Sequence, residues 1–470
     1  MKRLLLGLLM AYGCSALHAQ EPTQNYINTR TLLNEAGNSY LNSTTYYDGI
    51  GRPFQTVEKE VKNDVQTGSI LATLQEYDTA GRETNSWLPI VISSDYIDPT
   101  TFKSSAPGNY SSDSRPYNQP VYEASPLNRL IKQYGPGAVW YSDHSINTEY
   151  LANTTTTPLN CIDYEVSGTG TLIDNGAYAA NQLQVVKTIG EDGNISYIFT
   201  DKLGHKVLER QMKGSETQDT YFVYDDRSNL CFVLQPMYQS VANLDQYTFQ
   251  YKYDGFNRCI WKKLPGAQYT GYVYDNADRL TFSQNGKQRT SGKWTFYLYD
   301  SLNRLTKQGE CTGQNPSASD AVVYLQNFYD DYSFRSQTGF NNANFTDGGT
   351  TGKSFPTGSI TAVLGSSDKI YSANYYDIKG RVIKTVHNNL LGGYETTSTA
   401  YTFTDQPATV THTHTASGKT TRTEVYTYTY DHADRVIKVE HTLNGTKVTL
   451  ATNTYDNLGR LSTKTLHGSA

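Results

Sequence analysis

Paired histidines, paired aspartates and cysteines are the side chains of this 470-residue sequence that could carry chemistry. His412 and His414 are separated by one threonine, so both imidazoles would lie on the same face of a β-strand. A metal site needs a third ligand and partners that orient the ligands. The sequence assigns no third ligand to this pair, so His412 and His414 are predicted to be solvent-facing polar residues.

Asp330 and Asp331 are the candidates for an acid pair of the kind that hydrolyses polysaccharides. Such a pair needs one carboxyl group with a raised pKa in a sheltered cleft. The residues around these aspartates are rich in Gly, Asn, Ser and Thr, which is typical of a solvated loop. The two acids are therefore predicted to be solvated side chains.

Cysteine chemistry is also sparse in this sequence. None of the cysteines after residue 20 lies in a recognisable nucleophile motif. Their even number permits two disulfides in an exported chain, and buried free thiols are the alternative. These residues are Cys161, Cys231, Cys259 and Cys311. The sequence therefore predicts no catalytic residue, no metal ligand, no cofactor and no enzymatic activity.

The remaining charged residues that could act together belong to a repeated phrase. It reads Tyr-Asp, two variable residues, then Gly, Asn or Asp, and then Arg, and it recurs at steps of roughly 20–30 residues, which is typical of arrays of supersecondary units. The residues at these turns are Asp48, Gly51, Arg52, Asp78, Gly81, Arg82, Asp254, Asn257, Arg258, Asp275, Asp278, Arg279, Asp300, Asn303, Arg304, Asp377, Gly380, Arg381, Asp431, Asp434, Arg435, Asp456, Gly459 and Arg460. Imperfect copies are predicted at Asp201, Asp225, Tyr329 and Thr404-Asp405.

Each repeat is predicted to be two strands joined by a turn. Aromatic residues alternate with polar residues before the turn, as in Phe249–Tyr253, which is the period of a half-buried strand. The Asp carboxylate can accept hydrogen bonds from main-chain amides, and the Gly, Asn or Asp position tolerates a positive φ. We expect the Arg to form an ion pair with the Asp of its own or a neighbouring turn. Single aspartates at turns do not resemble a calcium-binding loop.

The repeated phrase resembles the YD repeats of the Rhs family, densely so over residues 196–470. Near the N-terminus, Asn25–Ile27, Tyr47–Val57, Trp87–Pro89 and Pro126–Arg129 resemble the uncharacterised domain that precedes Rhs repeats in exported bacterial proteins. The resemblance implies an all-β fold in which hairpins join edge to edge into a coiled, shell-like sheet, an open barrel or cocoon.

The Rhs resemblance also implies a role. Rhs shells enclose a polypeptide cargo, commonly a toxin, so we expect a non-enzymatic scaffold that encloses or presents a C-terminal cargo. The expected partners are a downstream polypeptide that completes the shell or an encapsulated toxin domain, because neither is recognisable in this sequence. A cell-surface adhesin or carbohydrate-binding protein is the alternative, in which Tyr110, Tyr117 and Tyr122 would contact surface glycans.

The N-terminus has the pattern of a secretory signal peptide. Basic Lys2 and Arg3 precede an apolar run and small residues up to Ala19, and the apolar run is too short for a membrane span. The chain is therefore expected to be exported to the cell envelope, the cell surface or the medium. Lipoprotein anchoring at Cys14 is the alternative.

Composition agrees with an exported β protein. Tyrosine accounts for 39 residues, and hydrophobic residues make up only 37% of the chain, which is little for one compact core but enough for a thin sheet. The formal net charge is −5 and basic residues are not clustered, which argues against nucleic acid as a partner.

The predicted domains follow from the spacing of the repeats. Residues 1–19 form the signal peptide, 20–195 an N-terminal Rhs-associated domain with two repeats and a long polar insertion, and 196–470 the repeat array. The segment Ser93–Pro126 contains five prolines and is predicted to be irregular loop. An insertion at 310–370 is predicted to interrupt the array, as loops or as unrecognised strands.

Overall fold

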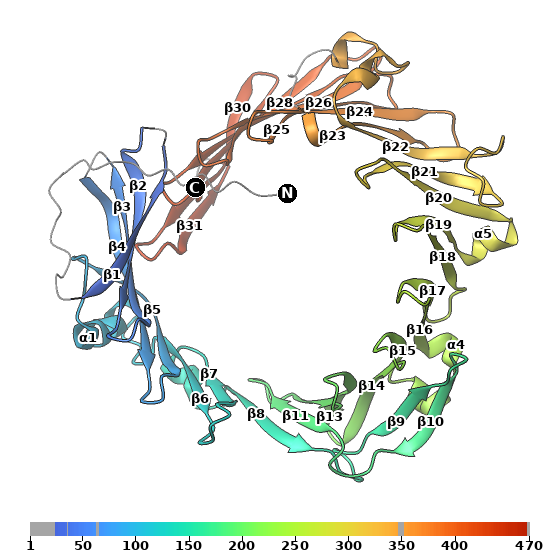
Figure 1. The fold of residues 1–470 in the computed structure, drawn as a ribbon. Helices are drawn as coiled ribbons and strands as arrows, with labels where there is room; N and C mark the ends of the chain where they lie inside the picture. Colours follow the sequence, from blue (N-terminus) through green and yellow to red (C-terminus); the bar gives the residue numbers. More distant parts are fainter. Residues whose placement is uncertain (1–23, 35, 63–64, 346–351, 468–470) are drawn as a thin grey trace. The chain divides into compact units, whose positions relative to one another are not determined.

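The computed structural model describes residues 24–34, 36–62, 65–345 and 352–467. The predicted signal peptide and Cys14 lie outside the described residues. The chain divides into two compact units, one of residues 1–121, 134–142 and 454–463 and the other of residues 122–133, 143–453 and 464–470. Strands dominate both units (Figure 1). No helix in the described part of the chain is long and apolar enough to cross a membrane.

The first unit is built on an antiparallel sheet in which β1 to β6 pair in sequence order. Its elements are β1 (Asn25–Leu32), β2 (Ser39–Tyr47), β3 (Pro53–Lys62), β4 (Val65–Tyr77), β5 (Glu83–Ile92), α1 (Pro99–Asn109), β6 (Tyr117–Tyr122) and α2 (Ala138–Tyr141). Alternate residues of β2 are buried, including Tyr40 and Tyr46, as the period of a strand with one covered face requires.

The segment Ser93–Pro126 is not all loop, and the prediction of irregular structure was wrong for residues 99–109. Helix α1 begins with Pro99, and the Asp98 side chain caps it by accepting from the N–H groups of Thr100 and Thr101. Phe102 and Ala106, four residues apart, are completely buried against the sheet of the first unit (Figure 1). Tertiary packing thus stabilises a helix that has little intrinsic helical signal.

The second unit contains a longer antiparallel sheet. Strand β8 pairs with β11, and from β11 to β30 every strand except β9 and β10 pairs with the next one along the chain. The strands are β8 (Ser145–Ala152), β11 (Gln184–Ile189), β12 (Ile195–Thr200), β13 (Lys206–Lys213), β14 (Glu216–Tyr224), β15 (Leu230–Leu234), β16 (Thr248–Tyr253), β17 (Cys259–Lys263), β18 (Thr270–Tyr274), β19 (Leu280–Gln284), β20 (Lys293–Tyr299), β21 (Leu305–Thr312), β22 (Val322–Asp330), β23 (Gly352–Ala362), β24 (Lys369–Tyr376), β25 (Val382–Asn388), β26 (Tyr394–Tyr401), β27 (Pro407–His414), β28 (Arg422–Tyr430), β29 (Val436–Leu443) and β30 (Thr446–Tyr455).

The elements outside these two meanders are short. They are β7 (Leu130–Tyr134), the hairpin of β9 (Ile162–Val166) and β10 (Leu172–Ala177), α3 (Tyr238–Val241), α4 (Leu244–Tyr247), α5 (Gly286–Thr290), the 3₁₀ turns η1 (Ser333–Ser336) and η2 (Ala343–Phe345), and β31 (Leu461–Leu466). The chain is therefore nearly all-β, with hairpins joined edge to edge, and the predicted fold class is confirmed.

The predicted interruption at 310–370 affects the repeat sequence and not the pairing of strands. Strands β21, β22, β23 and β24 pair in order through this segment. The segment supplies strands, which was one of the two alternatives that the sequence left open, and the long connection between β22 and β23 lies over the sheet.

Much of the longer sheet is a single layer. In β27 and β29 every residue is half-buried, so neither face is sealed from solvent. Strands β15, β17, β18 and β19 have five residues each. Only two residue pairs join β17 to β18 in this ladder, Trp261 with Gly271 and Lys262 with Thr270. Such a sheet cannot depend on one continuous hydrophobic core.

Hydrophobic cores form where a connecting segment covers one face of a sheet. Helix α1 covers the first unit, and the β9–β10 hairpin covers β11–β15. The connection between Tyr332 and Phe345 packs Phe334, Phe340 and Phe345 against β24 and β25. Gly358 permits this approach, because a Cβ atom there would lie 2.4 Å from the Phe334 ring.

A buried ion pair anchors the β9–β10 connection. The Arg210 guanidinium donates to the Asp219 carboxylate at 2.7 and 2.5 Å, and the Arg210 side chain is only 2% exposed. The same guanidinium donates to the carbonyl oxygens of Pro158 and Asn160 at 2.7 and 3.1 Å. Because this buried charge is paired and its remaining donors are satisfied, it fixes where the connection leaves the sheet.

Candidate functional site at the repeat turns

The aspartate of each repeat turn organises the main chain around it. At Asp254, carboxylate Oδ1 accepts from the N–H groups of Phe256 and Arg258 at 2.9 and 3.0 Å, and Oδ2 accepts from Arg258 Nε at 2.7 Å. Asn257 has a φ of +61° and donates its N–H to the Asp254 carbonyl. One side chain therefore caps the turn, selects the left-handed residue and holds the arginine.

The same hydrogen bonds recur along both units. Two main-chain amides, at the second and fourth residues after the aspartate, donate to Oδ1 at Asp48, Asp78, Asp201, Asp225, Asp275, Asp300, Asp377, Asp431 and Asp456. Positive φ occurs at Gly51, Gly81, Gly204, Ser228, Asp278, Asn303, Gly380, Asp434 and Gly459. The structure thus places each predicted Asp, flexible residue and Arg together in one turn.

Arginine side chains connect neighbouring repeat turns. Arg258 donates through its second nitrogen to the Asp275 carbonyl at 3.1 Å and to Asp278 Oδ1 at 2.8 Å. Arg279 makes the equivalent bond to Asn303 Oδ1 at 3.0 Å. The guanidinium of each arginine also lies 5.2 Å from the ring centre of the next tyrosine.

Tyrosine hydroxyl groups make a second connection, which sequence reasoning missed. The hydroxyl of Tyr274 donates to the Cys259 carbonyl at 2.8 Å, and that of Tyr299 donates to the Leu280 carbonyl at 2.8 Å. The same bond is made by Tyr77, Tyr224, Tyr253, Tyr329, Tyr376, Tyr401 and Tyr430. The signal was present, because in most copies the acceptor directly follows the arginine position of the previous repeat.

The predicted copy at Thr404-Asp405 was assigned to the wrong residues. Thr402 occupies the aspartate position, since its hydroxyl oxygen accepts the N–H of Gln406 at 3.1 Å. Asp405 is the left-handed residue, with a φ of +67°, and Arg381 of the previous turn donates to it at 2.5 Å. The copy therefore starts at Tyr401, and a threonine hydroxyl performs the capping that a carboxylate performs elsewhere.

Asp330 and Asp331 do not form a catalytic acid pair. Two hydrogen bonds from Arg304, at 3.0 and 2.5 Å, lower the pKa of Asp330 to about 2. The Ser333 hydroxyl and N–H both donate to Asp331 and lower its pKa. Both carboxyl groups are ionised at neutral pH, so neither can serve as a general acid.

His412 and His414 are half-buried and paired, and the prediction that they face solvent was wrong. Glu395 lies between them, with Oε1 2.5 Å from His414 Nδ1 and Oε2 3.1 Å from His412 Nε2. Asn389 also donates to Glu395 Oε1 at 2.8 Å. Within the described residues, no group of three or more His, Cys, Asp or Glu side chains is arranged to hold a metal ion.

The cysteines are free thiols and are poor nucleophiles. All four lie in the described part of the chain as unbonded thiols. Burial raises the pKa of Cys161 to about 12 and that of Cys231 to about 11. The thiolate is the reactive form, so these two thiols are inert at neutral pH.

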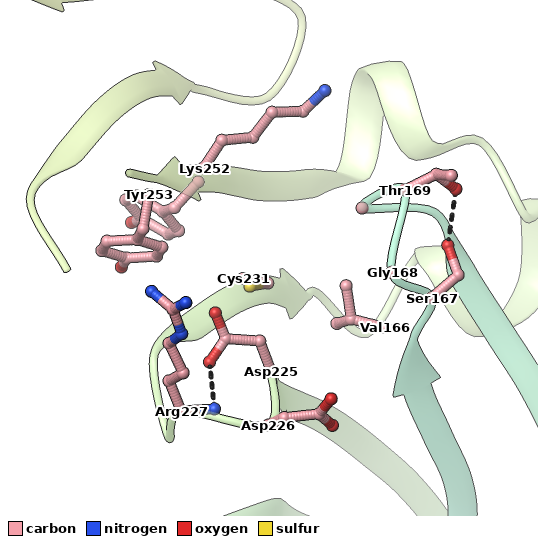
Figure 2. Close-up of a pocket in the computed structure, with 12 residues that line it drawn as sticks. Val166, Ser167, Gly168, Thr169, Asp225, Asp226, Arg227, Cys231, Lys252 and Tyr253 are labelled. Atoms are coloured by element: carbon pink, nitrogen blue, oxygen red, sulfur yellow. Dashed lines mark hydrogen bonds between the residues drawn. The ribbon is translucent and has the colours of Figure 1, made fainter. Parts of the chain in front are cut away.

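A polar pocket of about 310 Å³ adjoins one repeat turn. Its walls are the turn Ser167–Gly170 between β9 and β10, the repeat turn at Asp225–Arg227, and Lys252 and Tyr253 of β16 (Figure 2). The Asp225 carboxylate that faces it accepts the Arg227 N–H at 2.9 Å and thus belongs to the turn. The pocket has no pair of groups arranged for proton transfer or nucleophilic attack.

The three tyrosines considered for glycan binding participate in packing. The Tyr110 hydroxyl donates to the Pro89 carbonyl at 2.6 Å. The Tyr117 ring lies 4.4 Å from the Trp87 ring, centre to centre. Tyr122 is half-buried like the other two. The structure therefore gives these rings no shared exposed surface.

Comparison with known proteins identifies a partial family match and a similar fold. Residues 19–152 match DUF6443, a domain of unknown function. No curated protein matches the chain. The structure titled "Crystal Structure of TcdB2-TccC3" is similar with a TM-score of 0.61 and 14% identity, over 91% of this chain and 20% of that chain. The structure titled "Crystal Structure of TcdB2-TccC3 without hypervariable C-terminal region" is similar with a TM-score of 0.60 and 13% identity, over the same shares.

The fold and the repeat turns together define an all-β hairpin-repeat protein with a fold similar to the Rhs shell of TcdB2–TccC3. At 14% identity, the similarity concerns the fold alone. The chain spans about a fifth of the length of the chains that it matches. These findings fit an Rhs-related protein.

The tyrosine hydroxyl bond can be tested within one strand. Tyr430 in β28 donates to the Pro407 carbonyl at 2.9 Å. We expect Tyr430→Phe to lower the free energy of unfolding by about 1 kcal/mol, because it leaves a carbonyl without its partner. Chemical denaturation followed by circular dichroism measures the change.

Tyr428→Phe is the matched control, because Tyr428 lies two residues earlier in β28 and its ring is near that of Tyr430. This substitution should leave the unfolding midpoint within error of the parent protein. Equal losses in the two variants would show that the hydroxyl of Tyr430 has no special role.

Acid should weaken the repeat turns. Hydrogen bonds, first of all from the arginine main-chain N–H, lower the pKa values of Asp78, Asp275 and Asp300 below the ordinary 3.8. A lowered pKa in the folded state contributes stability above the unfolded value, and this contribution is lost as the pH falls through the folded value. We therefore expect stability to decline below about pH 4.

The double variant Asp275→Asn with Asp300→Asn tests whether the turns cause this decline. Its amides do not titrate, so it should be less stable at neutral pH and lose less stability on acidification. Denaturant midpoints measured from neutral pH to about pH 2 give both quantities. An identical acid response in parent and variant would contradict the assignment.

Proposed function

We propose that this chain is a non-enzymatic, exported repeat scaffold whose sheet forms part of the wall of an Rhs-type shell. The observation that carries this proposal is the connection between repeat turns. Each aspartate holds an arginine, and Arg258, Arg279 and Arg381 each bond to the following turn. This arrangement stiffens a sheet along its whole edge and provides no chemistry.

The single-layer construction also supports a wall. A sheet whose strands are half-buried on both faces presents two surfaces, one for each side of a wall. A compact enzyme of this length would bury a larger apolar core, whereas here the core consists of separate patches under α1, the β9–β10 hairpin and the Tyr332–Phe345 connection. The similarity in fold to TcdB2–TccC3 is consistent with this role.

The enclosed or presented partner in this proposal is a polypeptide cargo of the polymorphic toxin type. The resemblance of the turns to Rhs repeats supports it, because Rhs shells enclose such cargo. One of the similar structures has a hypervariable C-terminal region named in its title, which is a property of that protein. For this chain, the cargo would be a C-terminal domain or a separate polypeptide that completes the shell.

The proposal is tested by small-angle X-ray scattering on the purified chain. A compact single domain of this length has a radius of gyration of about 23 Å. A thin wall distributes the same mass farther from its centre, so we expect a clearly larger radius and a distance distribution with a broad maximum. A radius at or below the compact value would overturn the wall.

Export is a separate part of the proposal and depends on the N-terminal leader. Mass spectrometry of the protein from the envelope fraction should find a mature chain that begins near Gln20. A mature chain that begins at an acylated Cys14 would change the assignment to a lipoprotein. Retention of Met1 in the cytoplasmic fraction would contradict export and leave the wall proposal untouched.

A further inference from the structure

The residue at the tip of a repeat turn is apolar more often than the turn itself requires. The second residue after the aspartate contributes only its main-chain N–H to the carboxylate, as Phe256 does to Asp254 at 2.9 Å. Its side chain has no part in this bond, and in water a polar residue would be expected there. The residues at this position include Ile50, Ala80, Leu203, Phe256, Ala277, Leu302, Ala433 and Leu458.

The larger of these side chains in the second unit are exposed. Leu203 and Phe256 are each 79% exposed, and Leu302 is 66% exposed. Where the second position is polar, the first position can carry the apolar side chain: Ile378 is 93% exposed and Phe403 is 40% exposed. Nothing in the described part of the chain covers these five side chains, which we call the apolar tips.

The apolar tips lie at one edge of the sheet. Their turns connect β12 to β13, β16 to β17, β20 to β21, β24 to β25 and β26 to β27. In an antiparallel meander, alternate connections lie at the same edge, and all five belong to that set. Successive hairpins of a sheet are about 10 Å apart, so the tips stand at multiples of that spacing.

We infer that the row of apolar tips is an association surface for a second copy of this chain. A partner that buries such a row needs apolar groups with the same spacing, which another edge of the same hairpin array provides. Two copies related by a two-fold axis would present the same row to each other, the commonest symmetry of protein pairs. This inference stands on exposure and spacing and does not depend on the proposed function.

Sedimentation velocity on the full chain tests the inference. A reversible dimer is expected whose fraction rises with concentration in the micromolar range. The triple variant Phe256→Ser, Leu302→Ser, Ile378→Ser should raise the dimer dissociation constant by about 100-fold, because apolar anchors dominate such surfaces. Circular dichroism checks that the strands are retained.

The matched control carries the same number of apolar-to-serine changes on strand faces. Ile198, Ile260 and Leu298 lie within β12, β17 and β20 and are 39%, 37% and 38% exposed. The triple variant Ile198→Ser, Ile260→Ser, Leu298→Ser should dimerise like the parent. Restoring Phe256 alone in the tip variant should recover part of the affinity.

Three results would overturn the inference. A chain that is monomeric at every concentration has no such surface. Open-ended aggregation, or an equal loss in the tip and strand-face variants, would show general stickiness of exposed apolar groups. Binding of the monomer to anionic phospholipid vesicles, lost in the tip variant, would make the apolar tips a membrane contact instead.

Discussion

The three hydrogen bonds accepted by a turn aspartate are the constraint on which the rest of this structure depends. A single-layer sheet has little hydrophobic core to define where its strands turn, so the turn must define itself. At Asp254 the carboxylate satisfies two main-chain amides and one arginine. The second nitrogen of that arginine is then free to reach the following turn, so a local motif becomes a continuous edge.

The three covering segments complement this edge. Where β26–β29 run without a cover, half-buried residues and connected turns hold the sheet. Under the β9–β10 hairpin and the Tyr332–Phe345 connection, aromatic and aliphatic side chains form compact cores. Stability is thus distributed between polar connections at the edge and apolar patches on the faces, which agrees with the low hydrophobic content of the chain.

Features that depend on near neighbours in the sequence could be predicted, and features that depend on distant contacts could not. The strand–turn–strand unit and its left-handed residue follow from residues within one repeat. Helix α1 could not be predicted, because its prolines argue against it and only burial of Phe102 under the sheet reveals its cause. Thr402 was missed for a chemical reason, since a hydroxyl group replaces the expected carboxylate. No spacing rule places Glu395 between His412 and His414, because this contact depends on the register of β26 and β27.

Nearest-neighbour connections make the array quasi-one-dimensional, and such an array opens at its weakest rung. The junction of β17 and β18 has two residue pairs, fewer than its longer neighbours such as β20 and β21. Mechanical load or local unfolding will therefore concentrate there, between residues 259 and 274. A protein built to hold its contents would then have a preferred seam, and its position would be written into the length of its shortest strands.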